Sequence, residues 1–330
     1  MKTIVSVFLY VIICSIQIYA VSAEEINLNA KAAVIMDAES GKILYEKSKD
    51  QKMPNASTTK ILTCLYILKH CDLDQMAEVS KNAAMQPKVR LGVREGEKYK
   101  VKDLLYGLML ESYNDCAVVL AEHAEGSVEN FEKRMNQMAE NLGTLNTHFV
   151  TPNGLDGIDK KGRHETTAQD LAKIMARCIK NQQFLEITQT KQYTFTDGSR
   201  KRRFICNNHN ALLSSMQGVI SGKTGYTSKA GYCYVGAVKQ KNMTMTFSVL
   251  ASGWPPHKTY KWKDTAALLT YGEKNYNYRS WWEDPEIPLI RVKNGFREDP
   301  TKRVQYIRGI SDHPERRTAI HVTQGTGTAG

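Results

Sequence analysis

Residues 54–60 read Pro-Asn-Ala-Ser-Thr-Thr-Lys, and the apolar run Ile-Leu-Thr-Cys-Leu-Tyr-Ile-Leu follows directly over 61–68. The proline and asparagine are typical of a helix start, and the apolar run predicts a buried helix. Ser57 and Lys60 lie three residues apart, so their side chains share one face of this helix. A serine hydroxyl is a good nucleophile only when a base takes its proton. A lysine can be that base if burial, a second cation or the helix N-terminus lowers its pKa.

Ser-x-x-Lys alone occurs by chance in many sequences. Here two further motifs follow it in order, Ser112-Tyr113-Asn114 and Lys223-Thr224-Gly225. This ordered set resembles the serine DD-peptidase superfamily of penicillin-binding proteins and β-lactamases, with Tyr113 where some members have aspartate. Within the superfamily, the stretch from about residue 32 to about residue 272 looks like the low-molecular-mass D-alanyl-D-alanine carboxypeptidases.

The resemblance implies catalytic roles for three residues. Ser57 is expected to be the nucleophile, which forms an acyl-enzyme with the penultimate D-alanine of a peptidoglycan stem peptide. Lys60 is expected to be the general base. Ser112 is expected to relay a proton between Lys60 and the leaving nitrogen. No metal and no cofactor is implied, and β-lactam antibiotics are expected to acylate the same serine.

The remaining motif residues are expected to bind the substrate. Asn114 would bond a substrate amide and orient Lys60, and the positive charge of Lys223 would favour neutral Lys60. Gly225 lets a ligand backbone approach the strand closely. The expected oxyanion hole is the backbone N–H of Ser57 together with that of Tyr226. The substrate's terminal carboxylate is expected to be bound by Lys223, Thr224 and Thr227.

Three alternatives remain beside a carboxypeptidase that trims the cell wall. A DD-transpeptidase or endopeptidase would use the same motifs. A non-catalytic wall-binding protein would be expected to have lost the serine or the lysine, and both are present. A class A β-lactamase would carry a Glu-x-x-Leu-Asn element between the second and third motifs. That interval has none, because Glu140 is followed three residues on by Gly143 and Glu165 by Ala168.

The first 23 of the 330 residues differ from the rest. Lys2 precedes a nearly continuous apolar stretch over 4–18, and Val21-Ser22-Ala23 offers small residues for cleavage. This pattern predicts a secretory signal peptide that ends at Ala23, and therefore export to the cell wall, periplasm or outer membrane face. Without Lys2 the net charge falls from +11 to +10. A basic exported protein suits an anionic wall polymer or membrane surface better than nucleic acid.

Six cysteines remain after the signal peptide, and they lack both a C-x-x-C pair and an accompanying histidine cluster. This spacing does not favour a structural metal site, and most of the six are expected to be reduced core residues, although one bridge stays open. The basic run Arg200-Lys201-Arg202-Arg203 is interpreted as a solvated face, with contact to a wall polymer as the alternative.

The predicted elements indicate an α/β (α+β) fold. Residues 32–37 and 42–46 form a predicted hairpin, and three more strands are predicted over 219–224, 232–239 and 243–251. Helices are expected over 101–110, 115–124, 128–142 and 262–271, together with one that a capping box at Thr166 and Gln169 opens. Residues 72–100 are expected to be irregular. Short links favour one five-stranded antiparallel sheet, covered by the first and last helices, with an all-helical insert.

The predicted domain organisation is a catalytic domain over 24–282 and a C-terminal segment over 283–330. Family members carry a second, β-rich domain and then an amphipathic helix, and this segment is too short for both. By this resemblance we expect either a reduced second domain or a truncated form of the chain, with a predicted strand over 289–292. The Gly- and Thr-rich end at 324–330 is predicted to be disordered.

Overall fold

The computed structural model describes residues 26–277 and 321–322. The predicted signal peptide, the predicted strand over 289–292 and the low-complexity end lie outside the described residues. No helix within the described ranges is both long and apolar enough to cross a membrane.

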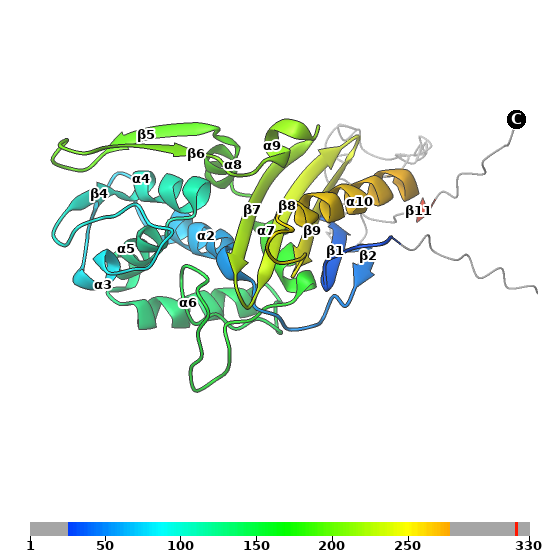
Figure 1. The fold of residues 1–330 in the computed structure, drawn as a ribbon, viewed down its shortest axis with the longest axis horizontal. Coiled ribbons are helices and arrows are strands. Elements are labelled where there is room, and N and C mark those ends of the chain that lie inside the picture. The colour runs from blue at the N-terminus through cyan, green and yellow to red at the C-terminus, as the bar shows by residue number, and fades with distance from the viewer. Residues whose placement is uncertain (1–25, 278–320, 323–330) are drawn as a thin grey trace, which may run out of the picture.

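One five-stranded antiparallel sheet forms the centre of the fold, with strand order β2-β1-β9-β8-β7 (Figure 1). Its strands are β1 (Ala32–Asp37), β2 (Ile43–Lys47), β7 (Val219–Thr227), β8 (Gly231–Gln240) and β9 (Met243–Leu250). The predicted hairpin and the three late strands are therefore confirmed. The register pairs Val34 with Ser248 and Lys223 with Val235.

Both faces of this sheet are covered. In β1, Val34 belongs to the core shared with α7 (Ala168–Cys178), whereas Ile35 packs with Leu268 of α10 (Tyr260–Asn275). Successive strand residues point to opposite faces, so these two helices lie on opposite sides. The predicted last helix is in place. The first helix does not cover the sheet, because α2 (Lys60–His70) packs among other helices and α7 takes that place.

The helical subdomain lies beside the β7 edge of the sheet (Figure 1). α2 runs through its centre and is buried along Lys60–Leu68. The subdomain also contains η1 (Ala56–Thr59), α3 (Lys81–Ala84), α4 (Val101–Tyr106), the π-helical turn η2 (Gly107–Glu111), α5 (Asn114–Glu125), α6 (Val128–Asn141) and α8 (Gln182–Gln189). The short helix α9 (Leu212–Ser215) packs on β7 instead.

Three small two-stranded sheets complete the described structure, and none of them was predicted. β3 (Met76–Glu78) pairs with β4 (Lys98–Lys100), so the stretch over 72–100 is less irregular than expected. β5 (Gln192–Thr196) pairs with β6 (Arg203–Asn207), which places the basic run in and after a hairpin turn. β10 (Tyr276–Asn277) pairs with β11 (His321–Val322). Strands of two to five residues that alternate polar and apolar side chains give a weak sequence signal.

The predicted cap of α7 is wrong in detail. The cap of α7 is Thr167, whose hydroxyl accepts from the backbone N–H of Asp170, one residue later than predicted. Neither Asn114 nor Asp115 caps α5, because Tyr113 is the residue before it and makes no side-chain cap. The side chains of Asn114 and Asp115 have other partners, which belong to the candidate site.

The six cysteines within the described residues are all unpaired, and five of them are buried: Cys64, Cys116, Cys178, Cys206 and Cys233. They pack as small apolar side chains in the core.

Candidate active site

Ser57 lies in a tight 3₁₀ turn, η1, immediately before α2. The turn is held from inside, because the hydroxyls of Thr58 and Thr59 donate back to the carbonyls of Asn55 and Ala56 at 2.6 and 2.9 Å. The Asn55 side-chain amide donates to both hydroxyls. These buried bonds fix the turn and leave Ser57 half-buried, with its Oγ toward Lys60.

Lys60 is completely buried at the start of α2. Its Nζ lies 2.8 Å from Ser57 Oγ, 2.9 Å from Asn114 Oδ1 and 2.6 Å from the backbone carbonyl of Asn153. Burial, and then the nearby Lys223, lower the pKa of Lys60 well below its ordinary value. Two of the causes that the sequence suggested, burial and a second cation, are therefore present.

The second motif lies in the break between η2 and α5. Ser112 ends η2 in the left-handed conformation, with φ +67°. This turn places its Oγ 2.9 Å from Lys223 Nζ, so Ser112 bonds to the lysine of the third motif. Asn114, two residues on, bonds to Lys60. The loop thus connects the two lysines of the site.

The third motif lies on β7, the edge strand that faces the helical subdomain. Lys223 is buried, and burial lowers its pKa to about 7. A Cβ on Gly225 would lie 2.9 Å from the backbone nitrogen of Ser57 and 3.0 Å from that of Thr58. Only glycine therefore lets β7 lie this close to the serine turn.

The other predicted residues of β7 border the same place. Thr224 is half-buried, and its carbonyl accepts from Lys223 Nζ at 2.9 Å. Tyr226 is exposed and packs on Tyr232. The Thr227 hydroxyl bonds to Asp156 at 3.3 Å. The structure thus brings every residue of the three motifs to one place between β7 and the helical subdomain.

Sequence reasoning missed the part that Asn153 plays. Asn153 lies in a turn over 151–155, in which Gly154 has φ +84°. The turn directs the carbonyl of Asn153 to Lys60, and the Asn153 side chain donates to Gln86. A backbone acceptor carries no residue signature, so only the folded chain shows it.

His164 was also missed, since it takes part in no triad. It is buried, and its Nδ1 accepts from the backbone N–H groups of Val150 and Thr151 at 2.9 and 3.2 Å. Its Nε2 must then carry the proton and donate to Thr59 Oγ1 at 2.8 Å. Neutral His164 thus fastens the 150–155 turn to the serine turn. Burial lowers its pKa to about 3.

We expect His164 to make the fold acid-sensitive. Because its folded pKa of about 3 lies below the ordinary value of 6.5, the unfolded chain binds the extra proton first. This contribution is fully present above about pH 6.5 and is lost as the pH falls toward 3, at up to about 1.4 kcal/mol per pH unit. Urea unfolding between pH 4 and 7 measures it. His164→Gln should flatten the slope, whereas exposed His257→Gln should not; an unchanged slope in His164→Gln would contradict the assignment.

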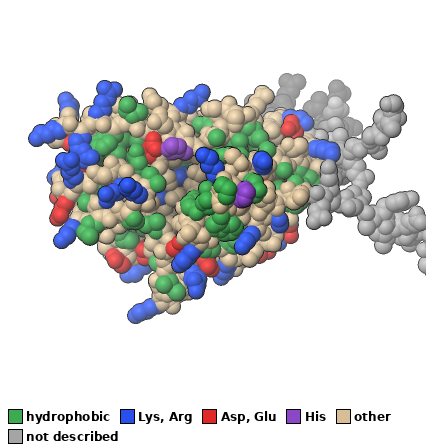
Figure 2. Space-filling view, in the orientation of Figure 1, with side chains coloured by type: hydrophobic (Ala, Val, Ile, Leu, Met, Phe, Trp, Pro, Cys, Tyr) green, Lys and Arg blue, Asp and Glu red, His purple; other side chains and the backbone are tan. Residues whose placement is uncertain are grey.

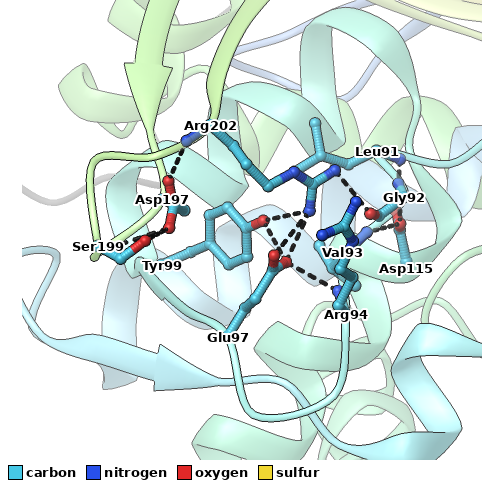
Figure 3. Close-up of polar contacts among 10 residues, drawn as sticks. All are labelled: Leu91, Gly92, Val93, Arg94, Glu97, Tyr99, Asp115, Asp197, Ser199 and Arg202. Atoms are coloured by element: carbon cyan, nitrogen blue, oxygen red, sulfur yellow. Dashed lines mark hydrogen bonds and ion pairs between the residues drawn. The ribbon is translucent and has the colours of Figure 1, made fainter.

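The segment over residues 86–97, which we call the strap, packs against the start of α5 and is bonded to Asp115 there (Figure 3). Asn114 donates from its backbone N–H to the Val89 carbonyl at 2.8 Å and from Nδ2 to the Pro87 carbonyl at 3.2 Å. The Asp115 carboxylate accepts from the N–H groups of the strap at Leu91, Gly92 and Val93. These bonds explain why neither side chain caps α5.

Arg202 fastens the outer half of this strap, as Figure 3 shows. Its guanidinium donates to Glu97 at 2.7 Å and to the Gly92 carbonyl at 2.9 Å, and it lies over the ring of Phe204. The interpretation of the basic run as a solvated face is therefore wrong for Arg202. Its three neighbours, Arg200, Lys201 and Arg203, are exposed.

Comparisons with known proteins agree with this geometry. The model of the D-alanyl-D-alanine carboxypeptidase family matches residues 19–253. D-alanyl-D-alanine carboxypeptidase DacF of Bacillus subtilis is 30% identical over 277 residues, which cover 82% of this chain and 69% of the relative. A crystal structure of a D-alanyl-D-alanine carboxypeptidase from Mycobacterium tuberculosis superposes with a TM-score of 0.71 at 30% identity, covering 77% and 94% of the two chains.

A variant of a Streptomyces DD-transpeptidase superposes with a TM-score of 0.70 at 31% identity, covering 76% of this chain and 99% of that one. The resemblance read from the three motifs is confirmed over most of the chain, and so is the predicted fold class. This chain belongs to the D-alanyl-D-alanine carboxypeptidase family.

Proposed function

We propose that the protein removes the terminal D-alanine from peptidoglycan stem peptides through an acyl-enzyme on Ser57. The observation that carries the proposal is the environment of Lys60. A neutral amine has two N–H donors and one lone pair. The carbonyl oxygens of Asn114 and Asn153 can only accept, so they take both N–H groups. The lone pair is left for the third partner, the hydroxyl of Ser57, 2.8 Å away.

Acylation then follows from this arrangement. Ser57 Oγ attacks the carbonyl of the penultimate D-alanine while its proton passes to Lys60. The N–H groups of Ser57 and Tyr226 are proposed to stabilise the oxyanion, typically by about 3 kcal/mol each. The C–N bond breaks, and the leaving D-alanine amine takes a proton, for which Ser112 is the proposed relay. Water then hydrolyses the ester and regenerates Ser57.

Substrate recognition is proposed to depend on a free carboxylate. The ammonium of Lys223 supplies the positive charge, and the hydroxyls of Thr224 and Thr227 lie on the same strand. Asn114 keeps its proposed second role, the bond to a substrate amide. β-Lactams carry a carboxylate next to a strained amide, so the same residues would hold them while Ser57 is acylated.

The pH dependence should report both lysines. The free enzyme needs neutral Lys60 and charged Lys223, so kcat/KM should fall above about pH 7 as buried Lys223 loses its proton. Bound carboxylate favours the ammonium, so the fall in kcat should come at higher pH. The arginine in Lys223→Arg stays charged, so kcat/KM of this variant should not fall at alkaline pH, even if its maximal rate is lower. The measurement is the pH profile from 5 to 10. The same alkaline fall in Lys223→Arg would show that another group titrates.

The direct test of the function is the mass of a synthetic stem pentapeptide ending in D-Ala-D-Ala after incubation with the protein lacking residues 1–23. We expect the loss of one alanine. An unchanged peptide, together with retained peptide binding, would favour the non-catalytic wall-binding protein instead.

Similarity to a DD-transpeptidase favours a second candidate, in which an amine rather than water attacks the acyl-enzyme. Adding glycine or a D-amino acid to the same assay separates the two, because transfer yields a peptide heavier than the hydrolysed one. In either case the predicted signal peptide and the wall substrate support export, and the net charge of +10 that remains without Lys2 supports contact with an anionic wall polymer or membrane surface.

A further inference from the structure

The two groups that accept from Lys60 belong to segments other than its own helix. One is the side-chain oxygen of Asn114, at the start of α5, and the other is the backbone carbonyl of Asn153. In the proposed mechanism they take both N–H groups of neutral Lys60, so the lone pair points at Ser57. Whatever holds these two acceptors in place therefore sets the direction of the base.

One end of the strap holds both acceptors. Nδ2 of Asn114 donates to the Pro87 carbonyl at 3.2 Å, and Nδ2 of Asn153 donates to Oε1 of Gln86 at 3.1 Å. An amide side chain is a donor at one end and an acceptor at the other, so the bond to Pro87 leaves Oδ1 of Asn114 for Lys60. With the amide turned over, Nδ2 would donate to the lone pair of Lys60 and block the base.

Arg202, in the β5–β6 turn, holds the other end of the strap (Figure 3). Its guanidinium donates to the Gly92 carbonyl at 2.9 Å and to both carboxylate oxygens of Glu97 at 2.7 and 3.0 Å. Lys and Arg side chains are frequent on the surface at this end of the molecule, as Figure 2 shows, but Arg202 is only 25% exposed and Glu97 17%. Solvent and salt screen a sheltered ion pair less than an exposed one, so this pair fixes the outer end of the strap.

The two ends of the strap are close in the chain and share partners in α5. Between them, the Val89 carbonyl accepts from the backbone N–H of Asn114 at 2.8 Å. The buried Asp115 carboxylate accepts from the backbone N–H of Gly92 at 2.8 Å. A displacement at Gly92 is therefore passed on to Asn114, which bonds to the base.

We propose that Arg202 and Gln86 are positioning residues for the general base, acting on Lys60 through the strap and its contacts to Asn114 and Asn153. Neither side chain bonds to Lys60 itself in the described structure. The inference rests on the proposed function, since it assigns what directs the base of that mechanism. Loss of either residue would let the Asn114 amide turn over and let water reach Lys60, which is completely buried in the intact fold.

The loss should appear in two ways. The maximal rate of acylation by a chromogenic β-lactam should fall about tenfold in Arg202→Gln and in Gln86→Leu, less than the roughly 10²-fold that a misplacement of about 1 Å can cost. The acid limb of the pH profile should move to higher pH, because water at Lys60 relieves part of the burial that lowers its pKa. A purely structural role would lower the stability and leave the acid limb of the folded variant in place.

A shift of the acid limb can be assigned to packing, because the titratable groups that face Lys60 are unchanged in both variants. They are Lys223 on β7, Asp115 and Cys116 on α5, and His164. Arg202→Gln removes a positive charge, whereas Gln86→Leu removes none. The same shift in both variants therefore cannot come from the lost charge.

Stopped-flow acylation between pH 5 and 9 measures both effects in the protein lacking residues 1–23, and urea unfolding checks that each variant is folded. Two matched controls should keep both the rate and the acid limb. Arg203→Gln removes the same charge at the next residue, which is exposed, and Gln137→Leu makes the glutamine change at an exposed position of α6. Each variant, with its control, tests the proposal without the other.

The double variant of Arg202→Gln and Gln86→Leu distinguishes one shared route from two independent ones. If both residues act through the strap, its rate should stay well above the product of the two single losses. An unchanged acid limb in a folded Arg202→Gln or Gln86→Leu protein would overturn the proposal, as would losses that multiply in the double variant. If the β-lactam does not acylate the unaltered protein, the proposed function fails and the inference fails with it.

Discussion

Ser57→Ala is expected to abolish the covalent penicillin adduct and the release of D-alanine. The serine hydroxyl is the nucleophile in the proposed mechanism, and no other hydroxyl bonds to Lys60 Nζ in the described structure. Thr58 and Thr59, the two residues that follow it, are buried and bonded back into η1, so neither can replace it. Intact-protein mass after incubation with penicillin measures the adduct directly. We expect stoichiometric acylation of the unaltered protein and none of the variant.

The fold of this variant should be nearly unchanged. Ser57 Oγ has only the Lys60 bond and a long contact of 3.5 Å to the Asn153 carbonyl, so we expect a stability change of about 1 kcal/mol or less. Ser228→Ala, at an exposed serine in the β7–β8 turn, is the matched control and should be acylated normally. Stoichiometric labelling of a folded Ser57→Ala protein would remove Ser57 from the nucleophile role.

The parts of the site that the sequence predicted are those whose chemistry depends on side-chain type and short spacing. Ser57 and Lys60 are one helical turn apart in sequence, so local geometry alone brings them within a hydrogen bond. The strands β7, β8 and β9 could also be predicted from local sequence. Each spans eight to ten residues, so its apolar pattern is long enough to recognise.

The parts that could not be predicted depend on contacts between distant segments. Asn153 acts through a backbone carbonyl, and His164 acts by joining two turns. Arg202 lies 105 positions from Glu97, and a run of four basic residues does not show which one is paired. The bond from Lys223 to Ser112 was likewise hidden, because it needs the left-handed turn at Ser112 and the register of β7 together.

Lys60→Gln is expected to reduce acylation by about 10³-fold at neutral pH, within the range that general-base catalysis contributes. Glutamine can still donate to carbonyl oxygens, but it has no basic lone pair for the Ser57 proton. The acid side of the pH profile should disappear as well, since protonation of Lys60 causes it in the proposed mechanism. Stopped-flow acylation by a chromogenic β-lactam between pH 5 and 9 measures both effects.

The structure also predicts what Lys60→Gln will do to stability, and this separates catalysis from folding. Neutral Lys60 forms no ion pair, so its loss leaves no buried charge unpaired. The cost should come from Asn114 Oδ1 and the Asn153 carbonyl, at about 1–3 kcal/mol for each acceptor that the shorter side chain fails to reach. Lys69→Gln, at the exposed far end of α2, is the control and should keep both rate and stability. A folded Lys60→Gln protein with a loss below tenfold and an unchanged acid limb would require a different base, because none of the other groups bonded to Ser57 can accept its proton.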